Sequence, residues 1–571
     1  MVEKPVLRYT SRELRSGKDI PQEVMTMLHY LKREEIVEYD REHGRAVIRY
    51  SSDNYGNIVE IESLLPDHEI RKGTTIDFSF CFIDKASYDK IIESLDDSVD
   101  YIYGRFSVID VPFSPRVKNV SMSFEGATFR DRVSFGQNTF EHCATFDRVI
   151  FEGLAWFGSA IFNSSAGFNH ATFSSWSTFH EAKFNRGASF DKASFSDHTS
   201  FQFSVFNGAS FNNVTFSGEV SFYNVTFSGL ASFNNAVFSK IATFADAKFA
   251  TASFYRTIFS AGASFNNATS SGLASFVYAT FSGLVTFQGV TFSSETSFNN
   301  AVFLEEASFS DAELSNAAFD FSRMEKGLSL RNIKADGLNL NGSRIRDLTI
   351  SSEQEKEMSL SLREALITES VTVNVPRLKT LDVYRATIDR PLKIRWNDNV
   401  NYAIRDKLKR TEEYEKIENI HEYVGEEMLL LKENYRKQGW YDDEDNAYVE
   451  FKRVQRKTLS FGKKTVSLVA DVIGVYGTKP QRVALSMLVT MLFFALLYFI
   501  FWPDFTTMDP AAGFADRAVN SLYTSGIIFV TIGFTEMIPT GIPMFLIIVE
   551  GFMGLFLMAY FTISFSRKVL R

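Results

Sequence analysis

The sequence contains almost no cysteine. Its 571 residues include 2 cysteines, Cys81 and Cys143, which lie far apart in the chain. Small secreted domains depend on closely spaced cysteines, so this scarcity excludes a disulfide framework and indicates a reducing compartment. A cleaved signal peptide is not expected either, because the chain begins M-V-E-K-P without an apolar stretch.

A strong excess of one charge is also missing. The formal net charge is −9 at pH 7, which is modest for 571 residues. Nucleic-acid binders carry strongly basic surfaces, so no nucleic-acid partner is expected. The mean hydropathy of −0.08 and the 23% of charged residues describe a mostly soluble chain. Only roughly the last 90 residues contain the long apolar runs of a membrane protein.

The sequence shows no constellation of catalytic or metal-binding residues. Its 8 histidines include four in the middle of the chain that have no recurring carboxylate or cysteine partner, namely His142, His170, His180 and His198. Such scattered residues fit solvent-exposed corners better than a metal site. No phosphate loop or nucleotide fingerprint is present, so we predict no enzyme activity and no cofactor.

Phenylalanine, in contrast, is abundant and regularly spaced. From Phe124 onward the phenylalanines are separated alternately by five and six residues. A helix needs an apolar period near 3.6 and a flat strand a period of 2, so this ladder fits neither. The pattern places two inward-facing residues on each short segment and a polar corner after it. Such segments describe a coil with four short sides. The ladder begins with Phe124, Phe129, Phe135, Phe140, Phe146, Phe151, Phe157, Phe162, Phe168 and Phe173.

The ladder resembles the pentapeptide-repeat family, in its phenylalanine-rich form, from Phe124 to Phe319. Triplets such as A-T-F, A-S-F, A-V-F and V-T-F recur between positions rich in Asn, Ser and Gly. The resemblance implies a right-handed quadrilateral β-helix. We place it at residues 111–400, because Leu and Ile continue the pattern to about Ile394. At about 22 residues per coil and about 4.8 Å between coils, the phenylalanine tract would form roughly nine coils.

Two features of the ladder predict local irregularities. Five-residue steps follow one another at residues 201–216 and again at 244–259, which makes both places candidate bends or bulges. Ser270 and Leu314 occupy ladder positions, so their rungs should be weaker than those made by phenylalanine.

Residues 1–110 give a weaker signal. Glu23 to Ile36 has helical spacing, whereas A-V-I-R-Y and I-D-F-S-F-C-F-I alternate as strands do. A solenoid needs an end with a polar face, so we interpret part of this mixed α/β region as a cap.

Residues 401–460 are predicted to form a helical hairpin. Arg405 to Lys437 carries Glu, Lys and Leu at helical spacing, and Gly439 is a suitable C-terminal stop. Asp442 could cap a second helix, which would run from Asp443 to Arg456. The segment is similar to the hairpin that often joins pentapeptide repeats to a pore in bacterial proteins.

Residues 461–481 are predicted to form an amphipathic helix at a membrane surface, with Leu468, Val469, Val472 and Ile473 on one side. A basic cluster lies beside it, and contact with anionic lipid headgroups and a solvated helix face remain equal interpretations. The cluster consists of Lys452, Arg453, Arg456, Lys457, Lys463 and Lys464.

Residues 482–571 are predicted to form a membrane domain. Val483 to Trp502 has no charge, and its about 20 residues can cross about 30 Å of hydrocarbon. Met544 to Phe565 is long enough to be a second span. Basic residues precede the first span and follow the second, so the positive-inside rule places both termini in the cytoplasm. We therefore expect a multi-pass protein of the cell (inner) membrane.

The loop between the spans, S-L-Y-T-S-G-I-I-F-V-T-I-G-F-T-E-M-I-P, resembles the pore of potassium channels, whose filter reads T-V-G-Y-G-D or T-I-G-F-G-D. The resemblance implies a pore helix and a filter whose carbonyl groups replace the hydration shell of a cation. One chain cannot surround an ion, so a homotetramer is expected. Thr535 replaces the second glycine of the family and Glu536 the usual aspartate. The implied selectivity filter is Thr531, Ile532, Gly533, Phe534, Thr535 and Glu536.

The second span contains E-G-F-M-G, which resembles the inner helix of bacterial inward-rectifier channels, where a glutamate comes four positions before a glycine. The resemblance makes Gly551 or Gly554 the hinge of that helix. A carboxylate inside a membrane is costly unless it is paired or faces water. Glu550 could therefore line the cavity and attract ions, or form hydrogen bonds behind the filter as a protonated acid. The sequence leaves both roles open.

These observations predict a tetrameric, potassium-channel-like cation channel whose cytoplasmic β-helix serves regulation or the docking of a protein or ligand. Permeating K⁺ would be its only metal, and membrane lipid a further partner. A weakly selective cation channel that also passes Na⁺ is the alternative, because the φ > 0 required at Thr535 costs a β-branched residue about 1–2 kcal/mol. A membrane-anchored scaffold or DNA mimic is the alternative of another class. Its outer ladder positions carry mainly Asn, Ser, Thr and Gly rather than dense carboxylates, which disfavours DNA mimicry. No motif indicates the gating stimulus.

Overall fold

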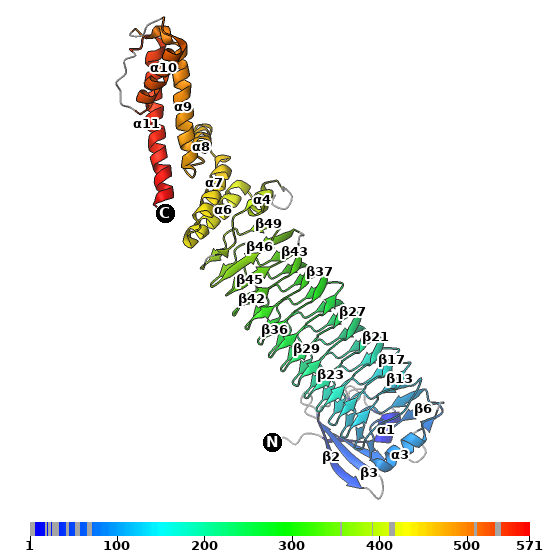
Figure 1. Cartoon of the computed structure of the whole chain (residues 1–571). Helices are drawn as coiled ribbons and strands as arrows, with labels where there is room; N and C mark the ends of the chain where they lie inside the picture. The colour runs from blue at the N-terminus through cyan, green and yellow to red at the C-terminus, as the bar shows by residue number, and fades with distance from the viewer. Residues whose placement is uncertain are drawn as a thin grey trace, which may run out of the picture. The chain divides into compact units, whose positions relative to one another are not determined.

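The computed structural model describes residues 6–16, 20, 24, 33–40, 45–51, 58–64, 71–96, 98–354, 357–390, 392–409, 417–506, 511–530 and 538–570. Its internal contacts divide the chain into two compact units. The first unit comprises residues 1–379 and 386–394, and the second comprises residues 380–385 and 395–571. The first is built mainly from strands and the second mainly from helices (Figure 1).

The first unit begins with a small mixed sheet. β2, β3 and β4 are antiparallel, and β1 is parallel to β4. The predicted strand at A-V-I-R-Y is confirmed in β3. The predicted helix is wrong at its end, because Arg33 to Ile36 pairs along β3 and this pairing overrides the local helical spacing. Residues 25–32 of that helix lie outside the described residues. The sheet order is β1 (Val6–Thr10), β4 (Ile58–Leu64), β3 (Arg45–Ser51) and β2 (Arg33–Asp40), and α1 (Ser11–Ser16) follows β1.

The sheet covers the first coil of the solenoid with apolar side chains. Ile48 and Ile61 belong to the same buried cluster as Phe82 and Val108. Tyr50 donates a hydrogen bond of 2.7 Å to the carbonyl oxygen of Phe106. Helix α3 (Lys85–Glu93) follows the first coil strands and is capped by Asp84, which accepts a hydrogen bond from the amide of Ser87. This is the arrangement expected of a cap.

A parallel β-solenoid forms the rest of the first unit and confirms the predicted coil of four short strands. Two of its sheets contain 15 and 13 strands. Parallel pairing starts at β6 (Thr75–Asp77), well before residue 111, and ends at β51 (Leu392–Lys393). In one coil, β13 (Thr139–Phe140), β14 (Ala144–Thr145), β15 (Ile150–Phe151) and β16 (Ala155–Trp156) pair with β17 (Ile161–Phe162), β18 (Ala166–Gly167), β19 (Thr172–Phe173) and β20 (Ser177–Thr178) of the next.

Phenylalanine rings stack through the core of the solenoid. The ring of Phe233 lies 4.9 Å from that of Phe211 in the preceding coil and 4.9 Å from that of Phe254 in the following coil, almost parallel to both. It also meets Phe222 and Phe244 edge-on, at 5.3 and 5.4 Å. All five side chains are fully buried. Such aromatic pairs add about 0.5–1.5 kcal/mol beyond the burial of their surface.

The polar corners use a left-handed backbone. Asn213, Asn224 and Asn235 have φ values of 56°, 51° and 56°. Asparagine tolerates this region better than most residues, which explains why it recurs at these positions. The amide of Asn213 donates to the carbonyl of Asn234 at 2.8 Å, so the corners also bond from coil to coil.

The five-residue steps produce the predicted irregularities. β24 (Val205–Ser210) pairs with β21 (Lys183–Ser189) through a register shift, and β30 (Lys248–Ser253) pairs with β27 (Thr226–Ser232) in the same way. In both places the corner is one residue shorter, yet phenylalanine still pairs with phenylalanine. The two ladder positions that lack phenylalanine are buried as well, since Ser270 and Leu314 are each 1% exposed. Ser270 compensates its polarity by donating a 2.9 Å hydrogen bond to the carbonyl of Gly272.

The second unit is helical. A helical hairpin is present and is formed by α6 and α7, but its first helix begins at Ile420 and not at Arg405. Gly439 ends α6 as predicted, with a left-handed φ of 71°. The predicted cap is wrong, because the N-cap residue of α7 is Trp440 and Asp442 lies in the first turn, where its charge favours the helix dipole. The helices are α4 (Asp398–Arg405), η1 (Asp406–Leu408), α6 (Ile420–Gln438), α7 (Tyr441–Arg456), α8 (Phe461–Gly474), α9 (Pro480–Ile500), η2 (Trp502–Asp504), α10 (Phe514–Phe529) and α11 (Ile542–Val569).

A buried ion pair holds the start of the hairpin. The side chains of Lys407 and Glu427 are completely buried and bond to each other. Glu427 also accepts a hydrogen bond of 2.8 Å from the amide of Val383. Burial raises the pKa of Glu427, and the charge of Lys407 opposes this rise. Nearby, Tyr423 donates to Asp382 at 2.6 Å, so the strand residues 380–385 are fixed to α6 by polar contacts as well as by packing.

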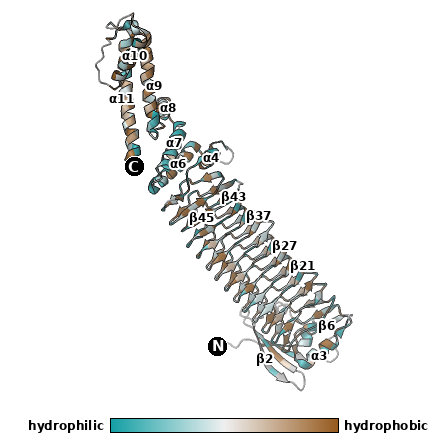
Figure 2. Cartoon of the chain, viewed as in Figure 1, coloured by the Kyte–Doolittle hydropathy of each residue, from teal (hydrophilic) through white to brown (hydrophobic). Residues whose placement is uncertain are grey.

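Two helices are long and apolar enough to cross a membrane. They are α9, with a hydropathy of 2.5, and α11, with a hydropathy of 2.2, and both lie where the sequence predicted spans. Figure 2 shows their hydrophobic colouring along most of their length. In each, 22% of the most apolar window is buried, so most of this apolar surface is not covered by the chain itself.

The stacked core predicts the cost of removing one ring. Phe233→Ala should destabilise the solenoid by about 3–5 kcal/mol, because six neighbouring rings lose a partner and the rigid coils cannot collapse into the cavity. Phe203, which is 42% exposed, is the matched control, and Phe203→Ala should cost about 0.5 kcal/mol. Urea titration of the full-length protein, followed by hydrogen exchange of the solenoid peptides, measures both. Equal losses for the two variants would contradict a core held by ring stacking.

Candidate functional site

Helix α10 lies between the two candidate spans. It has 16 residues, too few to cross about 30 Å at 1.5 Å per residue, and it packs against both α9 and α11. Ile528 at its end joins a buried cluster with Phe494, Tyr498 and Trp502. A short helix is therefore present between the two candidate spans, and its role as a pore helix stays a prediction.

The chain leaves α10 at Val530 and is next described at Ile538. There the amide of Thr506 donates to the carbonyl of Ile538 at 3.1 Å, and the amide of Thr540 donates to that of Asp504 at 2.8 Å. The returning strand is therefore tied to the loop that follows α9. The six predicted filter residues, Thr531, Ile532, Gly533, Phe534, Thr535 and Glu536, lie outside the described residues, and their arrangement stays a prediction.

Glu550 is completely buried between the three helices. Tyr498 from α9 donates a hydrogen bond of 2.5 Å to its Oε2 atom, and the hydroxyl of Ser525 from α10 bonds to its Oε1 atom. The Ser525 hydroxyl also lies 2.7 Å from the carbonyl of Met491 on α9. Further chains could only increase the burial of Glu550. In this conformation the contacts favour a hydrogen-bonded group behind α10 over one that faces a cavity.

The two candidate hinge glycines have different surroundings. A Cβ atom at Gly554 would collide with the backbone carbonyl of Phe529, at the end of α10. A Cβ atom at Gly551 would meet nothing within 4 Å. Gly554 therefore permits α10 and α11 to approach each other closely. Gly551 faces open space and is not needed for a close contact between helices.

The outer surfaces of these helices are apolar and exposed. Phe552 is 73% exposed, and Tyr523, on the opposite side of α10 from Ser525, is 60% exposed. Monomeric soluble proteins rarely present such a large apolar surface, so this surface is a candidate for contact with lipid or with other proteins. The exposed side chains include Leu485, Leu488, Val489, Leu492, Phe493, Leu496, Ile500, Val519, Phe545, Ile548, Leu555 and Phe556.

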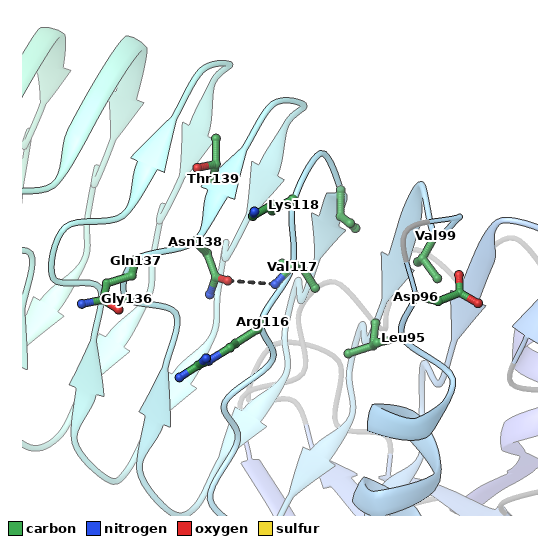
Figure 3. Close-up of a pocket in the computed structure, with 11 residues that line it drawn as sticks. Leu95, Asp96, Val99, Arg116, Val117, Lys118, Gly136, Gln137, Asn138 and Thr139 are labelled. Atoms are coloured by element: carbon green, nitrogen blue, oxygen red, sulfur yellow. Dashed lines mark hydrogen bonds between the residues drawn. The ribbon is translucent and has the colours of Figure 1, made fainter.

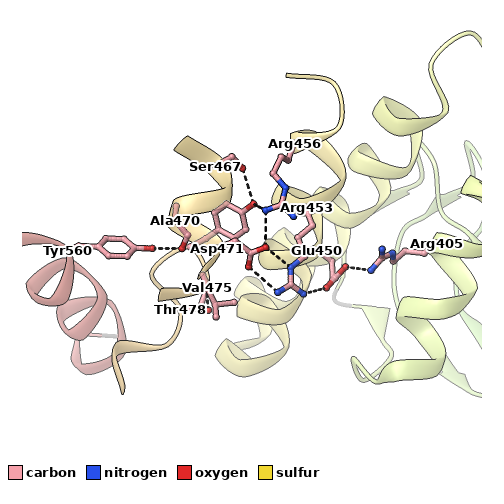
Figure 4. A network of polar contacts seen from close by, with 11 residues as sticks. Arg405, Glu450, Arg453, Arg456, Ser467, Ala470, Asp471, Val475, Thr478 and Tyr560 are labelled. Carbon is pink, nitrogen blue, oxygen red and sulfur yellow. Dashed lines mark hydrogen bonds and ion pairs between the residues drawn. The ribbon is translucent and has the colours of Figure 1, made fainter. Parts of the chain in front are cut away.

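The predicted basic cluster divides into two groups. Arg453 and Arg456, on α7, both bind the carboxylate of Asp471 on α8 at 3.0 Å (Figure 4). Burial raises the pKa of Asp471, but the hydrogen bonds and charges of the two arginines outweigh it and lower that pKa overall. Lys452 is half-buried and donates to Gln455 at 3.1 Å. The remaining members, Lys457, Lys463 and Lys464, are exposed.

The predicted helix is present as α8, which ends at Gly474 and presents Leu468, Val469 and Val472 to the outside, whereas Ile473 is half-buried; its position at a membrane surface stays a prediction. Its other side carries Asp471 toward α7. The ion-pair network continues along α7, because Glu450 binds Arg453 at 2.8 Å and Arg405 at 2.7 Å (Figure 4). A single carboxylate on an apolar and basic helix was the available sequence signal for Asp471, but its partners lie on another helix and could not be assigned from spacing.

The C-terminal half of α11 is bonded to α7, to α8 and to the turn after α8. Tyr560 donates to the carbonyl of Ala470 on α8 at 3.2 Å, and Ser564 donates to that of Gly477 at 3.0 Å. Arg567 binds Asp445 on α7 at 2.7 Å and lies over the ring of Tyr448. These contacts provide a direct connection from the hairpin to the second span.

The solenoid unit contains a separate pocket of about 370 Å³ near its first coils, which Figure 3 shows. Its buried polar side chain, Asn138, is satisfied on both sides, since it accepts from the amide of Val117 at 2.9 Å and donates to the carbonyl of Pro115 at 3.0 Å. Across the described ranges, no group of three or more His, Cys, Asp or Glu side chains could hold a metal ion.

Comparison with known proteins identifies the repeat. A family model described as pentapeptide repeats (9 copies) matches residues 146–194, 179–226, 190–236, 222–269, 254–302 and 276–323. All of these segments lie inside the solenoid, so this part of the chain consists of pentapeptide repeats. No curated protein and no solved structure matches the chain.

The glycine contacts predict opposite results for two small changes. Gly554→Ala should disturb the α10–α11 contact, because the added methyl group meets backbone that cannot rotate away, and should cost about 1–3 kcal/mol. Gly551→Ala, the matched control, should be neutral or slightly stabilising, since alanine has the better helix propensity. Thermal unfolding of both variants in the same detergent measures the difference. A neutral Gly554→Ala would show that α10 does not sit against this glycine.

The Asp471 contacts predict an energetic coupling between α7 and α8. Asp471→Asn should destabilise the helical unit by about 1.5–3 kcal/mol, because Arg453 and Arg456 lose their shared carboxylate. In a double-mutant cycle, Asp471→Asn with Arg453→Gln should show a coupling energy of about 1–3 kcal/mol. Asp471→Asn with Lys464→Gln should show none, because Lys464 is exposed. Additive effects in both cycles would contradict the network.

Proposed function

We propose that this pentapeptide-repeat chain is one subunit of a homotetrameric cation channel that conducts K⁺ across the cell membrane. The observation that carries the proposal is the order α9, α10, α11, in which a helix too short to span packs between two helices able to span. The sequence T-I-G-F follows α10 directly. Both termini would lie in the cytoplasm, since basic residues precede the first span and follow the second.

Several features support a tetramer. A filter needs oxygen atoms on all sides of the ion, and one loop supplies only one side. The exposed apolar side chains of α9, α10 and α11 provide surface for neighbouring subunits and for lipid. Glu550, Tyr498 and Ser525 would hold α10 in a fixed orientation within each subunit, so that four equal loops could meet around one axis.

The selectivity of the proposed channel for K⁺ over Na⁺ depends on Thr535. Thr535 stands where the resemblance requires a residue with φ > 0, so four copies would relax the outer part of the filter. The inner sites formed by Thr531, Ile532 and Gly533 can remain intact. A weakly selective channel of the same architecture is therefore the second candidate.

The contacts of α11 suggest how cytoplasmic parts would control the pore. α7 and α8 are coupled through Asp471, and both are bonded to the cytoplasmic half of α11. A change in the hairpin would therefore reach the second span directly, and the first span through α8. Lys457, Lys463 and Lys464, beside the exposed apolar side of α8, would contact anionic lipid headgroups. The solenoid would serve as the docking surface for a protein or ligand that shifts the gating equilibrium.

The decisive experiment measures cation flux into liposomes that contain the purified full-length protein. Gly533→Leu should abolish flux while the tetramer remains assembled, because a side chain at this position blocks the filter. Thr535→Gly should restore the backbone of the family and raise the preference for K⁺ over Na⁺. Tyr523→Phe, on the exposed side of α10, is a control that should retain flux.

The outcomes separate the candidates. Flux of K⁺ and Na⁺ at similar rates by the unmodified protein would favour the weakly selective channel. An unchanged K⁺ preference in Thr535→Gly would refute the role given to Thr535. If the reconstituted protein passes no cation and elutes as a monomer, the chain is a membrane-anchored scaffold.

A further inference from the structure

One outward column of the solenoid departs from its own pattern. Along the 15-stranded sheet, the first residue of each strand from Ile150 to Val302 is at least partly exposed, and it is always Thr, Ser, Val or Ile. The next two coils carry arginine instead, in β41 (Arg323–Met324) and β44 (Arg344–Ile345), and these two arginines are direct register partners. β47 (Leu366–Ile367) then returns to an apolar residue.

The two arginines are unfavourable for the fold alone. Neighbouring strands lie about 4.8 Å apart, and like charges that face each other across them destabilise a sheet. Arg323 has a partner in its own strand region, Glu325. Within the part of the chain that the structure describes, Arg344 has no hydrogen bond or ion pair from its side chain. A costly feature without a compensating contact is expected at a functional site.

A third arginine completes a shallow groove of about 280 Å³. Arg346 follows β44 and lies on the same face, where it forms only a loose, exposed contact of 3.7 Å with Asp347 at the rim. Its column neighbour in the preceding coil is Glu325, the one carboxylate that lines the groove. Leu366 and Thr368 close the other side. The groove therefore presents three guanidinium groups against one lining carboxylate, in a chain whose net charge is −9.

We propose that this groove binds a phosphomonoester. Guanidinium groups donate paired hydrogen bonds to phosphate oxygens, and arginine is favoured over lysine where this planar geometry is used. A phosphate dianion placed between Arg323 and Arg344 would relieve their repulsion and could still accept from Arg346. A carboxylate has only two oxygen atoms and one charge, so it satisfies three guanidinium groups less well. A small molecule and a phosphorylated side chain both supply this chemistry, and the experiment below separates them.

The proposal is independent of ion conduction and can be tested on the full-length protein in detergent. Line broadening in ³¹P NMR spectra measures binding of two probes, inorganic phosphate and phosphoserine, at constant ionic strength. The test variant is Arg344→Thr, which restores the residue type of the column. The matched control is Lys248→Thr, which does the same in another column, where the register neighbours of Lys248 are Thr226 and Thr269.

Both probes should bind the unmodified protein and Lys248→Thr equally, and bind Arg344→Thr at least about tenfold more weakly. Similar affinities for the two probes would assign the site to the phosphate group itself. Tighter binding of phosphoserine would assign it to a phosphorylated side chain. Equal binding by Arg344→Thr and the unmodified protein would overturn the proposal.

Unfolding in the absence of phosphate gives an independent readout. If the arginines serve a ligand, Arg344→Thr should raise the unfolding midpoint in chloride and lose the further stabilisation that phosphate gives the unmodified protein. A lower midpoint in chloride, with no effect of phosphate on either protein, would show that Arg344 has only a structural role.

Discussion

In-register stacking between neighbouring coils is the constraint on which the solenoid depends. A single coil cannot pair its own backbone or bury its own rings, because both tasks are performed by the coils before and after it. The ladder therefore has to keep its register through every corner. The one-residue shortenings beside Phe206 and Phe249 show this, since they occur at corners and leave the ring pairs Phe184–Phe206 and Phe227–Phe249 intact. The same constraint requires covered ends, and the N-terminal sheet covers the first coil with Ile48 and Ile61.

The repeat could be predicted because its period is carried by a single residue type. Its beginning could not, because the first coils use Ile76, Phe82 and Val108 in place of the regular ladder, and only their parallel pairing reveals them. The predicted helix at Glu23 to Ile36 failed at its end for a related reason. Helical spacing is a local property, whereas the cross-strand partner of Ile36 is Ile48, on the next strand. Local periodicity thus predicted the solenoid, but it missed the segments whose secondary structure is set by pairing with distant strands.

In the helical unit, too, features set by local sequence patterns could be predicted and features set by distant contacts could not. Two spans, the hairpin and the stop at Gly439 follow from local patterns, and all four are found. The surroundings of Glu550 depend on Tyr498 and Ser525, which lie on two other helices. The contact of Gly554 with Phe529 likewise depends on how α10 and α11 cross. Neither could be derived from spacing, which explains why the sequence left two roles for Glu550 and two candidate hinges.

The contacts of α11 limit any gating mechanism of the proposed channel. One part of this helix is held against α10 at Gly554, and its C-terminal end is held by charged contacts to Asp445 and by hydrogen bonds to α8 and the following turn. Gly551, which has open space beside it, precedes Gly554 and therefore lies outside the stretch between these two attachments, so bending there leaves both of them in place. A movement of the C-terminal end must exchange those polar contacts for others or for water. A ligand can drive that exchange only by the difference between its affinities for the two states, and a change from 1:99 to 99:1 requires a difference of about 10⁴-fold. Four subunits moving together reduce the difference that each must supply, so a weak ligand on every subunit could suffice where one on a single subunit could not.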